Sequence, residues 1–247
     1  MLSSESNNRV IDQTRNRRRR SLAASYHGLV VNRQRIIVPE KLDHAPPEEA
    51  RENLRDLVWV NRYFGGYGIL RRMMAKLVRP DEAFSLLDVG AASGDMGAAL
   101  RRRYPRALVT SMDYRSVHLA AAPQPKVIGD AFQLPFRPAS FDFVFSSLFL
   151  HHFSNEQVQE LFRNFASVAR RGVLAIDLER GPLAYYFMPA TRWLFGWHNL
   201  SMHDGPASVQ AAFKRDELLA LAKRAGLSKA EAASHRPWAR VSLVAPV

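Results

Sequence analysis

Acidic side chains follow three separate apolar segments of this 247-residue chain, at the points where the segments end. Asp88 lies near the end of residues 84–89, Asp113 ends the second run, and Asp130 follows residues 125–129. The carboxyl ends of parallel strands form the edge at which open sheets bind ligands. One acid after a strand is usually a turn former or a helix cap. Three in succession predict a ligand site at the sheet edge.

Small side chains follow the first of these segments and lead into an expected helix over residues 96–103. They reduce bulk where a ligand must approach the backbone, and the glycines can adopt conformations that other residues avoid. The free N–H groups at the start of a helix attract polar or anionic groups. The pattern predicts a cradle for a nucleotide-like ligand, formed by Gly90, Ala91, Ala92, Ser93 and Gly94.

A nicotinamide-dependent dehydrogenase is a competing interpretation of this turn. Its fingerprint G-x-G-x-x-G begins where the strand ends. Counting from Gly90, the second and third positions hold Ala92 and Asp95, so two of the three glycines are absent. The frame that ends at Gly97 has the spacing but starts too late in the turn. The sequence therefore disfavours a dehydrogenase.

The order of these motifs resembles that of class I S-adenosylmethionine-dependent methyltransferases. The resemblance spans residues 79–247 and is greatest to the small-molecule branch that includes the quinone-biosynthesis methyltransferases. Ala92 stands where the family usually has the middle glycine of its first motif. The resemblance implies a Rossmann-like, doubly wound α/β fold, whose seven-stranded sheet has an antiparallel last strand. The motifs that carry it are Asp88-x-Gly90-x-Ala92-x-Gly94, Asp113, Gly129-Asp130-Ala131, Leu134-Pro135-Phe136, Phe141-Asp142-Phe143-Val144 and Leu150-His151-His152.

The same resemblance implies S-adenosylmethionine as the cofactor and an in-line transfer of its methyl group. The turn 90–94 would hold the methionine end, with Asp88 near the ammonium group. Ser146 and Ser147, at the end of the fourth expected strand, would lie near the reacting sulfur.

Residues after the second and third strands would bind the nucleoside part of the cofactor. Asp113 would accept hydrogen bonds from both ribose hydroxyls, because a carboxylate offers two acceptor oxygens. Tyr114 would pack on the adenine or ribose. Asp130 would accept from the adenine amine, with Ala131 donating its backbone N–H and Phe132 giving apolar contact.

Histidines are the candidates for a catalytic base, since their ordinary pKa lies near neutrality. His151 and His152 follow the fourth strand, where relatives line the reaction chamber. His198 and His203 are alternatives. Neither a carboxylate pair nor a helical His-x-x-x-His pattern accompanies them, so we expect no metal.

An aromatic-rich segment, residues 181–213, follows the fifth expected strand at 172–177. It lies where relatives insert their substrate-binding segment, and it carries few charges. Aromatic side chains of this kind also pack simple helical insertions. We favour a pocket wall for a flat, apolar, quinone- or polyketide-like acceptor. The expected contact residues are Tyr67, Trp193, Trp197, His198 and His203.

The sequence divides into three expected parts. Residues 1–45 form a basic arm and linker, with eight arginines and three acids in residues 1–40. Residues 46–78 form a helical cover over the pocket, broken by glycines at 65–68. Residues 79–247 form the methyltransferase domain, with the insertion 181–213.

Two further functions stay open beside small-molecule methylation. The net charge of +12 and the basic arm suggest an RNA methyltransferase. A Pro-Pro-type motif after the fourth strand is absent, because Ser146-Ser147-Leu148-Phe149 stands there. A non-catalytic relative could keep the fold as a binding module, although the three intact acids argue against it. The chain has no cysteine and no apolar run long enough to span a membrane, so we expect a cytoplasmic protein. A homodimer is possible.

Overall fold

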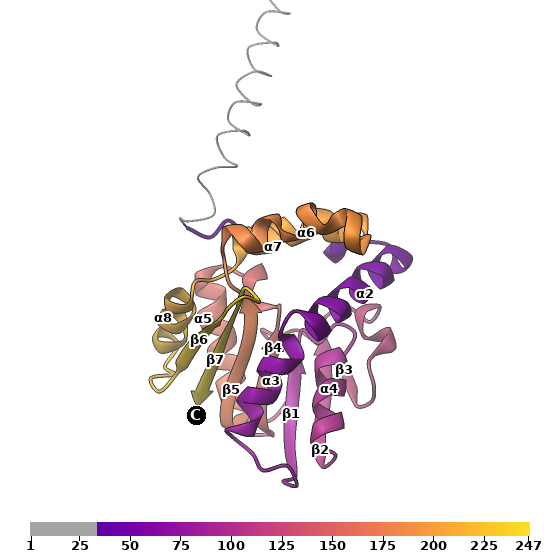
Figure 1. The fold of residues 1–247 in the computed structure, drawn as a ribbon. Helices are drawn as coiled ribbons and strands as arrows, with labels where there is room; N and C mark the ends of the chain where they lie inside the picture. The colour runs from indigo at the N-terminus through magenta and orange to yellow at the C-terminus, as the bar shows by residue number, and fades with distance from the viewer. Residues whose placement is uncertain (1–33) are drawn as a thin grey trace, which may run out of the picture. The chain divides into compact units, whose positions relative to one another are not determined.

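A computed structural model describes residues 34–247, and most of the predicted basic arm lies outside the described residues. Seven strands form one sheet in the order β3-β2-β1-β4-β5-β7-β6 (Figure 1). β7 runs antiparallel to β5 and β6, and the other neighbouring strands are parallel. The predicted α/β class and its antiparallel last strand are confirmed. The strands are β1 (Phe84–Val89), β2 (Ala107–Asp113), β3 (Lys126–Ile128), β4 (Phe141–Ser147), β5 (Ala169–Leu178), β6 (Glu231–His235) and β7 (Arg240–Pro246).

Helices pack on both faces of the sheet because its central strands are apolar on both sides. Leu87 and Val144 face the core shared with α5 and α8, whereas Leu86 and Phe145 face the core that includes α3 and α4. The α-helices are α2 (Pro47–Tyr63), α3 (Gly66–Ala75), α4 (Asp95–Arg103), α5 (Asn155–Val168), α6 (Pro182–Phe195), α7 (Asn199–Ala211) and α8 (Arg215–Arg224). Short 3-10 turns are η2 (Lys41–His44), η3 (His118–Ala121) and η4 (Leu150–His152).

The predicted insertion forms two helices, α6 and α7. Figure 1 shows them at the end of the sheet where β5 finishes, with α2 beside them. Hydrogen bonds join α7 to α2, since Asp56 accepts from the backbone N–H of His198 (2.9 Å) and from the hydroxyl of Ser201. In the part of the chain that the structure describes, none of the helices has the length and apolar character needed to cross a membrane.

The N-terminal strap, residues 35–45, corrects the expected boundary of the arm. We expected residues through 45 to form a loose arm and linker. Instead, the Arg35 guanidinium donates to the carbonyl oxygens of Ala211 (2.6 Å) and Phe153 (2.9 Å), and the backbone N–H of Ile36 donates to Gln210 (3.1 Å). The Glu40 side chain is buried. Sequence patterning missed the strap because it has no helical or strand period.

Candidate functional site

A pocket of about 960 Å³ lies between the carboxyl ends of the strands and the helices α2, α6 and α7. Its polar part is formed by the loops that follow β1, β2 and β3. Its apolar part is formed by the helices and the loop between β6 and β7. Representative lining residues are Gly90, Asp113 and Asp130 in the polar part, and Leu57, Phe64, Phe187, Met188 and Trp238 in the apolar part.

The turn after β1 requires glycine at its first position. Gly90 has a φ of +68°, and a Cβ there would lie 2.2 Å from the ring of Phe149. Ala92 also has a positive φ, of +47°, which explains why glycine is usual at this position. Gly90 and Ala92 line the pocket. Ala91, Ser93 and Gly94 complete the turn but are not among the lining residues.

Asp113 lies on the pocket wall at the end of β2, as predicted. Its carboxylate accepts from the N–H groups of Ala92 (3.0 Å) and Arg115 (3.0 Å) and contacts Nδ1 of His118 at 3.2 Å. Burial would raise its pKa, but these hydrogen bonds and the histidine outweigh burial and lower it. The carboxylate is thus held ionised, with at least three of its roughly four acceptor positions occupied. The two ribose hydroxyls of a bound cofactor would have to share the acceptor positions that remain on this carboxylate.

The other predicted nucleoside contacts also line the pocket. Asp130 accepts from the backbone N–H of Phe132 (2.8 Å), which holds the loop after β3. Tyr114 is 75% exposed at the rim, where its ring can cover a ligand. Ala131 is buried beside them. The structure therefore brings Asp113, Tyr114 and residues 130–132 together.

Asp88 lies behind the pocket wall and is not among the lining residues. It is 1% exposed, and one of its carboxylate oxygens has no hydrogen-bond partner within residues 34–247. Burial, reinforced by the negative charges of Asp95 and Asp113, raises the pKa of Asp88 well above its usual range. The predicted contact between Asp88 and the cofactor ammonium would have to be indirect.

The predicted serines at the end of β4 are not among the lining residues either. Ser146 is buried in the sheet. Leu148 takes a φ of +53°, and Leu148 and Phe149 line the pocket instead. The pocket wall at the end of β4 is therefore formed by Leu148 and Phe149 rather than by the predicted Ser146 and Ser147.

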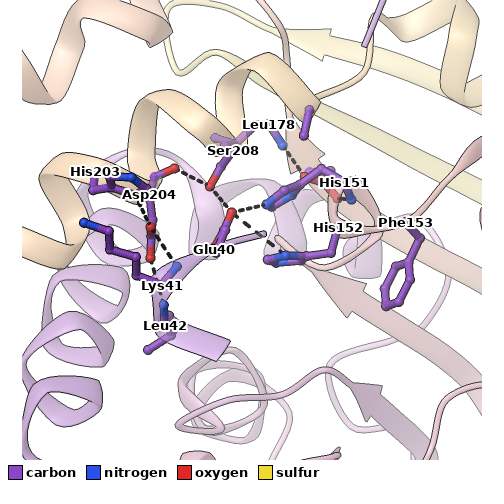
Figure 2. A network of polar contacts seen from close by, with 12 residues as sticks. Glu40, Lys41, Leu42, His151, His152, Phe153, Leu178, His203, Asp204 and Ser208 are labelled. Carbon is purple, nitrogen blue, oxygen red and sulfur yellow. Dashed lines mark hydrogen bonds and ion pairs between the residues drawn. The ribbon is translucent and has the colours of Figure 1, made fainter. Parts of the chain in front are cut away.

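His151 and His152 line the pocket together with Glu40 (Figure 2). His151 is buried between two carboxylates: its Nδ1 lies 2.6 Å from Asp177, and its Nε2 lies 3.5 Å from Glu40. Burial opposes a charge on the ring, but Asp177 and Glu40 outweigh burial and raise the pKa of His151 to about 10. Near neutral pH the ring is protonated, so His151 cannot act as a general base there.

Sequence reasoning missed three polar residues of this site. Asp177 lies at the end of β5 and would have been found by the strand-end rule that identified the other acids. His118 gave no signal beyond its distance of five positions from Asp113. Glu40 lay in the expected linker. Burial would raise the pKa of Glu40, but His151, His152 and a hydrogen bond from Ser208 lower it to about 2.

The structure does not place the predicted tryptophans on the pocket wall. Trp193 is 83% exposed. Trp197 is 4% exposed and packs against Trp59, with its Nε1 donating to Thr191 at 3.0 Å. Phe187, which does line the pocket, precedes Trp193 by six positions, so the two lie about 120° apart around the helix. Sequence analysis identified the aromatic helix but not its inward face.

Three other predicted acceptor contacts are absent from the lining and have structural partners. The side chain of His198 caps α7 by accepting from the N–H of Leu200. His203 contacts Asp204 at 2.8 Å. Tyr67 is hydrogen-bonded to Asp95; burial and that carboxylate raise the pKa of Tyr67 above its usual value.

The central part of the chain is similar to a known protein family. Residues 87–176, from β1 through β5, match the methyltransferase domain family. This part of the chain is therefore assigned to a methyltransferase domain. This methyltransferase domain has S-adenosylmethionine as its cofactor. The polar part of the pocket fits that group, since an ionised Asp113 and an exposed Asp130 face space beside the narrow turn at Gly90.

Two curated relatives match a limited part of the chain. Malonyl-acyl-carrier-protein O-methyltransferase of Xylella fastidiosa (strain M23) is 33% identical over 105 residues, covering 39% of this chain and 35% of that protein. A second protein of this description, from Coxiella burnetii, is 31% identical over 97 residues, covering 39% and 34%. The chain thus matches about a third of the length of these relatives.

Solved structures support the fold of the methyltransferase domain. A Haloferax volcanii methyltransferase in complex with a methyltransferase activator has a TM-score of 0.59 at 15% identity, covering 85% of this chain and 98% of that one. The plantazolicin methyltransferase BpumL, bound to S-adenosylhomocysteine, has a TM-score of 0.58 at 12% identity, covering 80% and 88%. At these identities the likeness concerns the fold alone.

Proposed function

We propose that this protein transfers the methyl group of S-adenosylmethionine to a small, flat, largely apolar acceptor. The observation that carries the proposal is a single pocket with two unlike parts. Its polar part contains Asp113 and Asp130 at the strand ends, and its apolar part contains Phe64, Phe187 and Trp238. A volume of about 960 Å³ lies at the upper end of the range for small-molecule sites, which leaves room for an acceptor beside the cofactor.

The residues of the chain would bind and position the reactants. When bound, the cofactor supplies an electrophilic sulfonium methyl group. Asp113 would accept from ribose hydroxyls, and Asp130 from the adenine amine. Phe187 packs edge-to-face against Phe64, with ring centroids 4.6 Å apart, and this wall would exclude water and orient a planar acceptor.

An oxygen nucleophile is the acceptor atom that we favour. The two curated relatives are described as O-methyltransferases of a malonyl group. Quinols, phenols and carboxylic acids are therefore the classes to test first, the quinols because of the sequence resemblance stated above. The pocket lining has more carboxylates than guanidinium groups, which disfavours a nucleic-acid acceptor with its phosphate backbone.

The test is a screen of phenols, quinols and carboxylic acids with cofactor carrying a labelled methyl group. With an acceptor identified, Phe187→Ala should lower kcat/KM for it by about ten-fold or more, because an apolar contact is lost. The affinity for S-adenosylhomocysteine, measured by calorimetry, should stay unchanged.

Trp193→Ala is the matched control, because this aromatic residue lies on the same helix but outside the pocket lining. It should change neither the acceptor kinetics nor the cofactor affinity. Equal losses of kcat/KM in the two variants would show that both substitutions only destabilise the fold around α6. The acceptor site would then lie elsewhere.

A further inference from the structure

Glu40, His151 and His152 come together from distant parts of the chain at the pocket wall (Figure 2). Glu40 Oε1 lies 3.5 Å from Nε2 of His151 and 3.9 Å from Nδ1 of His152. Both distances exceed those of normal hydrogen bonds. Two ligands bound at 2.0–2.2 Å to one tetrahedral ion lie about 3.4 Å apart, close to what is seen here. The three ligand atoms all lie within 4.8 Å of one another.

We propose that Glu40, His151 and His152 form a binding site for one divalent transition-metal ion. Once the ion displaces the proton that His151 carries near neutral pH, two imidazole nitrogens and one carboxylate oxygen form a donor set that suits zinc, iron, cobalt or nickel better than magnesium or calcium. Binding an ion would require the side chains to adjust, since Glu40 lies 3.5 and 3.9 Å from the two imidazole nitrogens and the rings of His151 and His152 are stacked at 4.3 Å.

Residues around the three ligands orient them as in known metal sites. Asp177 accepts from Nδ1 of His151 at 2.6 Å, which fixes the ring so that Nε2 points to Glu40. Metal-bound histidines almost always have such a carboxylate or carbonyl partner on the other nitrogen. Asp177 also accepts from the backbone N–H groups of His151 (3.2 Å) and Leu178 (2.7 Å), so its own position is fixed.

The carboxylate of Glu40 is held in place from the other side. The hydroxyl of Ser208, on α7, donates to it. Asp204, one turn earlier on the same helix, accepts from the backbone N–H groups of Lys41 (3.1 Å) and Leu42 (3.0 Å). These contacts anchor the strap at the residue that would bind the ion.

The position of the site suggests its role. All three ligands line the pocket, and three protein ligands leave coordination positions open toward it. An ion there could bind an oxygen of the acceptor and favour its ionised form, a role that rests on the proposed function. The metal site itself does not depend on that function.

The experiment uses the full-length chain without a tag, after removal of metal with a chelator. Zinc is titrated by calorimetry, and cobalt by its visible absorption, which reports nitrogen ligands and coordination number. We expect one equivalent to bind. Glu40→Gln and His152→Phe, which keep side-chain size, should weaken binding by about 100-fold, and Asp177→Asn by about 10–100-fold.

His235→Gln is the control, because His235 lies on β6, outside the pocket lining, and contacts Ser242. It should bind zinc as the unaltered chain does. Circular dichroism and S-adenosylhomocysteine affinity show whether each variant remains folded and keeps its cofactor site. Absence of a saturable equivalent in the unaltered chain, or unchanged affinity in folded Glu40→Gln and His152→Phe, would overturn the site. The triad would then be an ion-pair network only, and the proposed methyl transfer would still stand.

Discussion

Two aspartates at neighbouring strand ends have opposite electrostatic environments. Asp113 is held ionised by backbone N–H groups and His118, whereas Asp88 is buried beside other carboxylates. A carboxylate with several donors loses little by leaving water, but a buried one with few donors and negative neighbours is costly to ionise. This difference places ligand recognition at Asp113 and makes Asp88 a residue whose ionisation costs stability.

Asp113→Ala should weaken S-adenosylhomocysteine binding by about 10–100-fold, because charge-assisted hydrogen bonds are lost and the turn at Ala92 is no longer held. Calorimetry measures the change. Asp142→Ala removes another carboxylate, hydrogen-bonded to Ser85 at the opposite end of the sheet, and should leave the affinity as it is. An equal loss of S-adenosylhomocysteine affinity in both variants would contradict the assignment of Asp113 as a cofactor-binding residue.

Asp88→Asn should change how stability depends on pH. The pKa of Asp88 is raised in the folded state, so the folded chain binds more protons than the unfolded chain above about pH 4. Stability from this group is therefore present at low pH and is lost as pH rises toward the folded-state pKa. Urea unfolding at pH 5 and pH 8 should show the variant gaining stability relative to the original chain at the higher pH. If the variant and the original chain differ in free energy of unfolding by the same amount at both pH values, the pKa of Asp88 is not raised in the folded state.

At the scale of elements, the strap and the insertion complete a pocket that the sheet alone leaves open. Strands and the helices between them were predictable, because apolar runs such as residues 84–89 and 141–147 need only local patterning. The strap was not predictable from the sequence, because individual polar contacts, rather than a repeating apolar pattern, fix its position. The inward face of α6 was missed because aromatic residues occur all round the helix, and only tertiary packing selects Phe187 over Trp193.

Arg35→Ala should lower the free energy of unfolding by about 2–4 kcal/mol, because this one guanidinium bonds several oxygens and stacks on the ring of Phe213 at 3.9 Å. Urea unfolding measures the loss. Arg55→Ala, which removes an exposed pair with Glu52, should cost at most about 0.5 kcal/mol.

Truncation tests the same contact. Removing residues 1–34 leaves the Arg35 contacts in place, whereas removing residues 1–37 deletes them. The longer deletion should therefore reproduce the loss seen in Arg35→Ala, and the shorter one should not. Equal stability of the two truncated chains would show that residues 35–37, including the Arg35 contacts, contribute nothing to stability.

At the scale of the whole molecule, one pocket lies between the carboxyl edge of the sheet and a cover formed by α2, α6, α7 and the strap. The cofactor half was predictable because each of its residues follows a strand, and the order of strands fixes where their ends meet. The acceptor half depends on how α2, α6, α7 and the strap pack, which a single sequence does not encode in any short pattern. The central claim is that the polar half binds S-adenosylmethionine.

Calorimetric titration of the full chain with S-adenosylhomocysteine tests this claim most directly. We expect one site per chain, an affinity in the micromolar range, and a melting temperature that rises with ligand concentration by mass action. Phe187→Ala should bind with the same affinity. Neither heat nor a shift in melting temperature at roughly millimolar ligand would contradict the account, because the polar half of the pocket would then bind something else.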